Sequence, residues 1–243
     1  MSKGESGVQP TKVPERSVDN KPTIYTYATC PFSLKVKSLL KSRDIEFSNV
    51  EVDPMKKTEL KWSDWKKVPI FVDVDGTHVN DSNDILHYID EKHGNKFPRE
   101  GEDSEQDKWM DFSNDILGKS ILPVIYNSYG SSRQALRYVA DVESFTRFLK
   151  WKSIWLGGII MRMVGKSRGK MFDLPPEENL VHQLTVLSDG FNGDFFGGTT
   201  PNGADYANYG ILRSMQGLRG WNIVESHSKA GPWFARMQTT TGV

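Results

Sequence analysis

The chain has 243 residues with 31 basic and 31 acidic side chains, so its formal net charge at pH 7 is zero. A neutral chain offers no electrostatic reason to expect a nucleic-acid partner. It contains one cysteine and five histidines, and the histidines show no metal-ligand spacing. We therefore expect neither a disulfide framework nor a metal centre, and the length suits one large domain or two small ones.

The first twenty residues are polar and predict a disordered tail, residues 1–20, without the apolar core of a signal peptide. The most apolar run, residues 154–165, contains Arg162 and is too short to cross a hydrocarbon core of about 30 Å. A buried helix or a dimer face fits that run better than membrane contact does. We expect a soluble, cytoplasmic protein with at most peripheral contact with a membrane.

The single cysteine, Cys30, lies where a predicted buried strand runs into a predicted helix. Cys30 falls at the N-cap and Pro31 in the first turn, where proline is best tolerated. Unpaired backbone N–H groups and the positive end of the helix dipole favour a thiolate there, and Lys35 and Lys37 add positive charge. The pattern predicts a reactive thiol; the alternative is a small buried core residue.

The following elements keep a regular order. The sequence predicts a helix, a strand, a further strand, a hairpin around Asp75-Gly76 and another helix, in the ranges 31–42, 46–52, 67–72, 74–79 and 81–92. With Cys30-Pro31 opening the first helix and Val68-Pro69 opening the third strand, this order resembles the glutaredoxin-type thioredoxin fold. The resemblance implies a cis Val68-Pro69 bond that presents the backbone of Val68 beside the sulfur.

Asp81 and Ser82 stand at the predicted start of the helix that ends near Lys92. The Ser82 hydroxyl and the helix N–H groups suit a carboxylate, and Asp81 suits an ammonium group. Together they fit the γ-glutamyl end of glutathione, although an ordinary helix cap is the alternative. Lys67, with its neighbour Lys66, is a candidate for the glycyl carboxylate.

The second half of the chain has a helical period throughout. We predict a glutaredoxin-like domain at 21–92, a linker at 93–104 and a helical domain at 105–243, with helices at 105–117, 141–149, 153–164, 176–191, 205–218 and 233–237. The fold class is α+β, with a thioredoxin/glutaredoxin-like domain followed by an all-helical domain similar to that of glutathione transferases. Asn202 and Asp205 form an imperfect capping box that serves stability rather than chemistry.

Several motifs together narrow the resemblance to one family. They are Tyr25-x-Tyr27-x-Thr29-Cys30-Pro31-Phe32, Val50 to Pro54, Lys67-Val68-Pro69-Ile70, Asp81-Ser82, and Gly197 to Arg213. This combination resembles the type 2 membrane-associated prostaglandin E synthases. The resemblance implies a homodimer that binds glutathione, with heme bound through glutathione as a further cofactor, and that isomerises prostaglandin H2 to prostaglandin E2.

The chain departs from that family at Ser33, which replaces the second cysteine of the family motif. A serine cannot resolve a mixed disulfide, so only monothiol chemistry is available. We expect the thiolate of Cys30, or of a glutathione beside it, to attack an endoperoxide oxygen. Tyr27 is a candidate hydrogen-bond donor to the sulfur, and Phe32 and Tyr126 are candidates for an apolar pocket between the domains.

Two other functions remain open. The monothiol motif is also typical of a glutathione S-transferase or thioltransferase acting on a small apolar electrophile. A non-catalytic protein that binds glutathione or heme is the second alternative.

Overall fold

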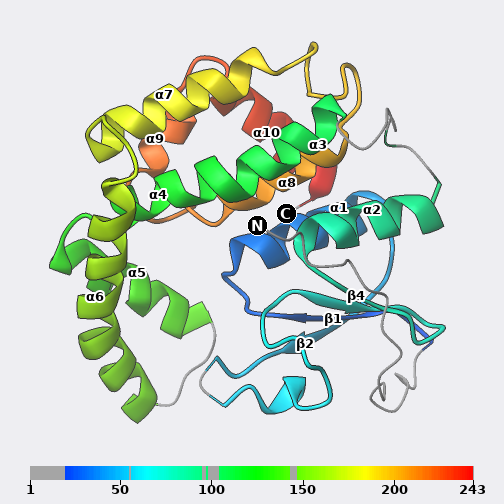
Figure 1. The fold of residues 1–243 in the computed structure, drawn as a ribbon, viewed down its shortest axis with the longest axis horizontal. Coiled ribbons are helices and arrows are strands. Elements are labelled where there is room, and N and C mark those ends of the chain that lie inside the picture. The colour runs from blue at the N-terminus through cyan, green and yellow to red at the C-terminus, as the bar shows by residue number, and fades with distance from the viewer. Residues whose placement is uncertain (1–19, 55, 95–96, 98–103, 143–146, 243) are drawn as a thin grey trace.

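The computed structural model describes residues 20–242 except 55, 95–96, 98–103 and 143–146, and between 139 and 156 it describes the backbone alone. The predicted tail lies almost wholly outside the described residues. Figure 1 shows two parts: a small sheet with two helices on one face, and a larger set of helices that covers the far side of those two. The sheet-bearing part lies in the first half of the chain, as predicted.

The sheet has the strand order β2-β1-β3-β4. Its elements are β1 Thr23–Thr26, β2 Ser48–Glu51, β3 Ile70–Val72 and β4 His78–Asn80, with helices α1 Pro31–Ser42 and α2 Ser82–Lys92. β1 runs parallel to β2 and antiparallel to β3, and β3 pairs antiparallel with β4. This is the thioredoxin-like arrangement that the order of elements predicted.

Alternation along the strands divides the side chains between two apolar clusters. Ile24 and its partner Phe71 are fully buried in the larger core with α1 and α2. Tyr25 and its partner Ile70 belong to a second cluster that also contains Val68. Because successive side chains of a strand point to opposite faces, one short strand builds both clusters.

The turn between β3 and β4 confirms the predicted hairpin. The backbone N–H of Asp73 donates to the carbonyl of Thr77 over 2.7 Å. Gly76 has a φ of +88°, a backbone conformation that glycine adopts without steric cost.

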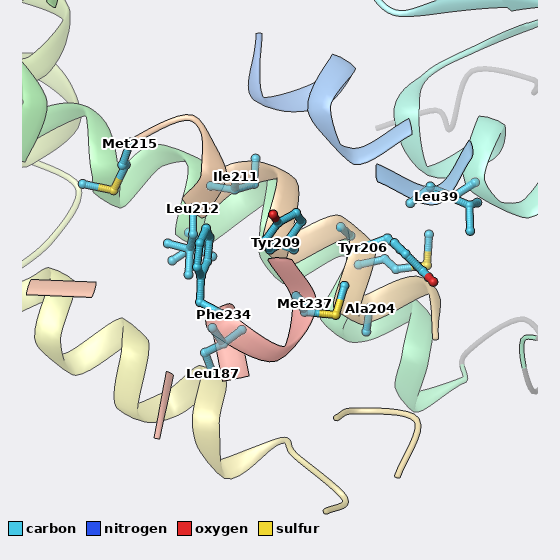
Figure 2. Packing of buried hydrophobic residues seen from close by; sticks show 14 of the residues in the cluster. Leu39, Leu187, Ala204, Tyr206, Tyr209, Ile211, Leu212, Met215, Phe234 and Met237 are labelled. Carbon is cyan, nitrogen blue, oxygen red and sulfur yellow. The ribbon is translucent and has the colours of Figure 1, made fainter. Parts of the chain in front are cut away.

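The second half is helical, as predicted, in the residues that the structure describes. Its elements are α3 Glu105–Phe112, a π-helical turn η2 Ser113–Leu117, α4 Gly118–Ile125, α5 Tyr129–Val142, α6 Arg147–Gly169, α7 Pro176–Asp189, α8 Gly203–Arg213, α9 Trp221–Ser226 and α10 Ala230–Thr241. Helix α8 is buried from Gly203 to Leu212. Figure 2 shows Leu212 of α8 against Phe234 of α10, with Leu187 of α7 nearby.

The region between 126 and 170 differs from the prediction. Helix α5 was not expected, and α6 runs unbroken from Arg147 to Gly169 where two shorter helices, 141–149 and 153–164, were predicted. The large apolar side chains that are described in this run are not all buried within the chain, because Ile159 and Ile160 are each 50% exposed and Met163 is 67% exposed. None of the described helices is long and apolar enough to cross a membrane.

The predicted capping box at the start of α8 is confirmed and is larger than expected. The side chain of Asn202 accepts a hydrogen bond from the Ala204 N–H, and Asp205 accepts one from the Asn202 N–H over 2.9 Å. Asp205 also accepts bonds from the Phe196 N–H at 3.1 Å and from the Trp233 indole N–H at 2.8 Å. The box therefore connects α8, the preceding loop and α10.

The two domains meet where α8 packs on α1 (Figure 1). The approach is close because Gly210 has no side chain: a Cβ there would lie 2.4 Å from the backbone nitrogen of Lys35. The predicted linker begins after α2 ends at Lys92, and α3 begins at Glu105. Phe97 within it is only 4% exposed, so the linker contributes to the core.

Candidate active site at the start of helix α1

Cys30 occupies the N-cap of α1, with Pro31 at the first helical position, as predicted. Its backbone N–H donates to the Tyr27 carbonyl over 3.1 Å, and its own carbonyl accepts from the Leu34 N–H over 3.0 Å. The residue is partly exposed and packs against the second apolar cluster beside Val68. The thiol therefore belongs to a loop whose backbone is fixed on both sides.

The electrostatics of the thiol differ from the prediction. Burial raises the pKa of Cys30, and this effect outweighs the Ser33 and Phe32 N–H groups and the charge of Lys35, which act to lower it. The sequence correctly indicated that the helix start and Lys35 act to lower the pKa of the thiol, but the opposing effect of desolvation on this pKa was underestimated. The buried Ser33 hydroxyl has no partner with regular hydrogen-bond geometry among the described residues, yet it also lowers the pKa of the thiol.

A cavity of about 340 Å³ lies beside the thiol loop, between the two domains. Thr29, Pro31 and Phe32 line it from the sheet-bearing domain, and Leu122 and Tyr126 line it from the helical domain. The cavity thus brings together Phe32 and Tyr126, the two residues predicted to share an apolar pocket. Its further lining residues are Asn114, Gly118, Lys119, Ile121, Ile125, Tyr138, Arg168, Ser214 and Leu218.

The predicted glutathione residues lie just before β3 and at the start of α2. The Val68-Pro69 bond is cis, as the resemblance implied. Asp81 is the N-cap of α2 and accepts a hydrogen bond from the Asn83 N–H over 2.9 Å. Its φ of +68° is a strained value for a residue with a side chain, and strain of this kind is concentrated at functional sites. Ser82 is only 2% exposed, so its hydroxyl is less open than predicted.

The two lysines before Val68 differ from each other. The ammonium group of Lys66 is held by the carbonyl oxygens of Leu60 and Ser63 and is not directed toward a ligand. Lys67 is exposed and lies over the Trp65 ring, 5.1 Å from its centre. Only Lys67 therefore stays available among these two candidates.

Tyr27 lies beside Cys30 and packs against the same apolar cluster. Its backbone carbonyl contacts the Cys30 N–H. The role predicted for its hydroxyl, as a donor to the sulfur, stays a prediction.

Sequence reasoning missed the environment of Lys35. The side chain is fully buried, and its ammonium group donates to Ser113 Oγ over 2.6 Å, to Asn114 Oδ1, and to Asn83 Oδ1 at 3.5 Å. Burial lowers the pKa of Lys35 from its usual 10.5 to about 7. A signal was available, because Lys35 follows Phe32 by three residues and precedes Leu39 by four, which places it on the buried face of an amphipathic helix.

Metal binding has no support in the described part of the chain, where no three His, Cys, Asp or Glu side chains gather in a way that could hold an ion.

Comparison with known proteins agrees with this architecture. The sequence profile of the glutathione S-transferase N-terminal domain matches residues 24–97. The chain is 29% identical to prostaglandin E synthase 2 of Danio rerio, over 92% of this chain and 72% of that protein. It is 26% identical to prostaglandin E synthase 2 of Mus musculus, over 89% of this chain and 69% of that protein.

Solved structures share the fold at low sequence identity. A glutathione S-transferase from Rhodospirillum rubrum aligns with a TM-score of 0.62 and 16% identity, over 90% of this chain and 88% of that one. Glutaredoxin 2 from Salmonella typhimurium, solved in complex with glutathione, aligns with a TM-score of 0.61 and 16% identity, over 93% and 96% of the two chains. The chain therefore has the glutathione S-transferase-like fold, matches the glutathione S-transferase N-terminal domain over residues 24–97, and is similar to proteins named prostaglandin E synthase 2.

Proposed function

We propose that this chain is a glutathione-dependent isomerase that converts an apolar endoperoxide, of the prostaglandin H2 type, into a hydroxyketone of the prostaglandin E2 type. The observation that carries the proposal is the placement of the thiol loop: the residues on both sides of Cys30 form one wall of the apolar cavity between the domains. The names of the related proteins support the same reaction.

Glutathione is the proposed cosubstrate. Asp81 at the N-cap of α2 would accept its ammonium group, and the backbone N–H groups at the helix start, with Ser82, would hold the γ-glutamyl carboxylate. The backbone of Val68 would pair with the peptide part as an added strand. Lys67 is near enough in the chain to take the glycyl carboxylate. In this arrangement the glutathione sulfur would lie by Cys30.

The proposed step is an isomerisation without net oxidation or reduction. A thiolate forms a bond to one endoperoxide oxygen, and the O–O electron pair leaves on the other oxygen, which takes a proton and becomes the hydroxyl. A base removes the hydrogen from the carbon that carries the sulfur-bound oxygen. The C–H electron pair then forms the C=O bond, the S–O bond breaks, and the thiolate is released unchanged. We propose that Tyr27 donates a hydrogen bond to the sulfur or the leaving oxygen.

The cavity suits a substrate that is mostly apolar and carries an acid at one end. Phe32, Leu122 and Tyr126 supply apolar walls, whereas Arg168 brings positive charge to the same cavity. The charge of Lys119 there is paired with Asp115 over 2.9 Å. The Arg168 guanidinium contacts the sulfur of Met171 at 3.6 Å, a weak interaction that a carboxylate would readily replace. A long-chain acid with an endoperoxide has this combination of properties.

The residues that line this cavity are poorly suited to hold heme through its iron. The described lining residues include no histidine, cysteine or methionine that would bind the iron. Tyr126 and Tyr138 line the cavity and carry phenol oxygens of the kind that bind heme iron in some proteins, but burial raises the pKa of Tyr126 and so opposes its phenolate form. We derive no step of the reaction through heme.

Thiol–disulfide exchange is the second candidate, and Ser33 favours it. The buried Ser33 hydroxyl stands where a dithiol enzyme carries its resolving cysteine, so a mixed disulfide on Cys30 would await a second glutathione. This chemistry uses the same thiol and the same glutathione site but does not require the apolar cavity.

Two assays across four proteins separate these functions. We would measure isomerisation of an endoperoxide and reduction of a small disulfide, each with glutathione, for wild type, Cys30→Ser and Ser33→Cys. Lys41→Cys is the matched control, because it adds a thiol at an exposed position of the same helix.

Isomerase turnover that is lost in Cys30→Ser supports the proposal. If isomerisation is absent in wild type while disulfide reduction is present and increases in Ser33→Cys only, the second function is correct. Glutathione binding without either activity identifies a non-catalytic binding protein.

A further inference from the structure

Lys35 is a charged residue buried at the junction of the two domains. Its side chain is fully buried, its backbone lies against Gly210 of α8, and its ammonium group reaches between α2 and the π-helical turn. A buried ammonium group is costly unless its charge and its three donors are well accommodated. Such a residue calls for an explanation that goes beyond packing.

The direct partners of Lys35 are all neutral. The Ser113 hydroxyl accepts from Nζ over 2.6 Å and donates its own hydrogen to the Met110 carbonyl over 2.5 Å. Asn114 Oδ1 is a second close acceptor, whereas Asn83 Oδ1 is at the outer limit, 3.5 Å away.

Two close acceptors take hydrogen bonds from either the neutral amine or the ammonium of Lys35. Protonation adds a third N–H group, which has the long Asn83 contact, and the ammonium lies 5.3 Å from the centre of the Phe32 ring, two residues from Cys30. The neutral amine instead leaves its lone pair without a donor among these partners, so neither protonation state is fully satisfied.

The π-helical turn explains how two consecutive residues reach one nitrogen. In a regular α-helix, neighbouring side chains diverge by about 100° around the axis. The wider turn from Ser113 to Leu117 brings Ser113 and Asn114 to the same side, toward Lys35. Turns of this kind are frequent at functional sites, and Asn114 also lines the cavity beside the thiol.

Three ionisable groups act on Lys35 through space. They are, from the strongest to the weakest, Asp81 at the start of α2, Cys30 at the start of α1 and Asp111 on α3, and the Gly210 backbone of α8 lies against the backbone of Lys35. Asp81 and Asp111 are exposed to water, which screens them. Cys30 is different because burial opposes its ionisation although the residue is partly exposed, and because its charge appears only when the thiol ionises.

We propose that Lys35 is a positioning residue for the thiol. Its ammonium group supplies the counter-charge of the Cys30 thiolate, so that ionisation of the sulfur and protonation of the lysine occur as a coupled pair. The proton leaves Sγ, and Nζ ends with three hydrogens, so the pair changes from two neutral groups to two opposite charges without net gain of a proton. The inference rests on the proposed function only in taking Cys30 as the reacting centre. The pKa of Lys35, about 7, lets both states exist near neutral pH.

The test uses the single cysteine of the full chain, so that alkylation reports Cys30 alone. We would measure the rate of alkylation by iodoacetamide against pH, without glutathione or substrate, for wild type, Lys35→Gln and Lys35→Arg. Gln keeps hydrogen-bond donors without charge, and Arg keeps the charge. Lys41→Gln, an exposed position on the same helix, is the control. We expect Lys35→Gln to react about tenfold more slowly at pH 7 with its midpoint moved to higher pH, Lys35→Arg to recover most of the rate, and Lys41→Gln to match wild type.

A reciprocal measurement leaves Lys35 in place. In Cys30→Ala the favourable charge of the thiolate is absent, so the NMR titration of the Lys35 ammonium should move to lower pH than in wild type. A folded Lys35→Gln with the wild-type alkylation profile would overturn the proposal, and so would an unchanged Lys35 titration in Cys30→Ala. If Lys35→Gln does not fold, the reciprocal titration decides alone. Neither readout involves turnover, so a failure of the proposed isomerase reaction leaves this test intact.

Discussion

Two buried charges in this protein, Asp205 and Lys35, are held in different ways. Both side chains are fully buried. The Asp205 carboxylate accepts from three backbone N–H groups and from the Trp233 indole, at distances of 2.8 to 3.3 Å. All four donors belong to the helical domain and three of them are main chain, so the carboxylate meets a rigid and complete set of partners.

Lys35 instead meets side chains that come from different parts of the molecule. Its acceptors are a hydroxyl and two amides, of which the third, on Asn83, is distant. None of these partners carries charge, and the groups that do act on Lys35, such as Cys30, are partners only through space. Burial raises the pKa of Asp205 as well, but its four donors oppose that shift and suit this charge to stability. A charge with an incomplete set of partners, near a nucleophile, is suited to changing its protonation state.

The largest expected effect comes from removing the Asp205 carboxylate, which has the complete set of donors. Asp205→Ala leaves four N–H donors buried without an acceptor and should lower the free energy of unfolding by about 3–5 kcal/mol. Urea unfolding followed by circular dichroism measures this loss. Asp189→Ala is the control, because it removes an exposed carboxylate that faces Lys229 at 3.4 Å and should change stability by less than about 1 kcal/mol. Equal effects of the two changes would show that burial of Asp205 contributes little.

The next effect concerns the packing that buries Lys35. Gly210→Ala places a Cβ 2.4 Å from the Lys35 nitrogen and 2.7 Å from its Cα, both backbone atoms that cannot rotate away. The two helices must then move apart, which should cost about 1–3 kcal/mol and should also change the alkylation profile of Cys30. Differential scanning calorimetry and the alkylation assay test both parts.

Gly130→Ala supplies the matched comparison. Its new Cβ would have Ser128 Oγ at 3.7 Å as its nearest neighbour, an ordinary contact. This change should be neutral or stabilising by up to about 1 kcal/mol, because alanine favours a helix more than glycine does. If Gly210→Ala behaves like Gly130→Ala, the close approach of α8 to α1 is not what holds Lys35.

These two charged sites also show what the sequence can and cannot predict. Asn202 and Asp205 were recognised as a capping box because their relation is local, three residues apart on one helix turn. The bond from Trp233 was not predictable, since it depends on how α10 packs. Likewise Cys30 could be placed at a helix start, while the burial that raises its pKa comes from its surroundings in the fold.

The same limit explains the misplaced helices and the missed lysine. The boundaries at 141–149 and 153–164 were wrong because the long α6 has no breaking residue that marks its start. Lys35 was expected only to add positive charge near the thiol, and its burial was missed because α8 covers it from a part of the chain that no local pattern connects to α1. Phe32 and Tyr126 line one cavity, and they were grouped because the resemblance supplied the domain arrangement that their spacing alone does not; their role as a substrate pocket stays a prediction.

A smaller effect is the pH dependence of stability that Lys35 contributes. Because its pKa in the folded state is about 7 and its usual value is 10.5, the unfolded chain binds more protons between these values, and stability rises with pH across that window. In a Cys30→Ser background, which removes the coupled thiol, the slope should be at most about 1.4 kcal/mol per pH unit and should vanish in Cys30→Ser/Lys35→Met. Urea unfolding at pH 7, 8 and 9 gives the slope; parallel curves for the two proteins would contradict the lowered pKa.

The smallest expected effect comes from a substitution that completes the set of partners around Lys35. Asn114→Asp exchanges a neutral acceptor of Lys35 for a carboxylate in the same position, so the ammonium gains a contact partner and stays protonated at higher pH. The new negative charge also opposes the Cys30 thiolate, and alkylation at pH 7 should slow by about threefold. Asn83→Asp is the comparison, because its longer contact of 3.5 Å should give a weaker change of the same sign. Faster alkylation in Asn114→Asp would mean that the fuller protonation of Lys35 outweighs the repulsion from the new carboxylate. An unchanged NMR titration of Lys35 would contradict the prediction, because it would show that Asn114 Oδ1 is not a close partner of the ammonium group.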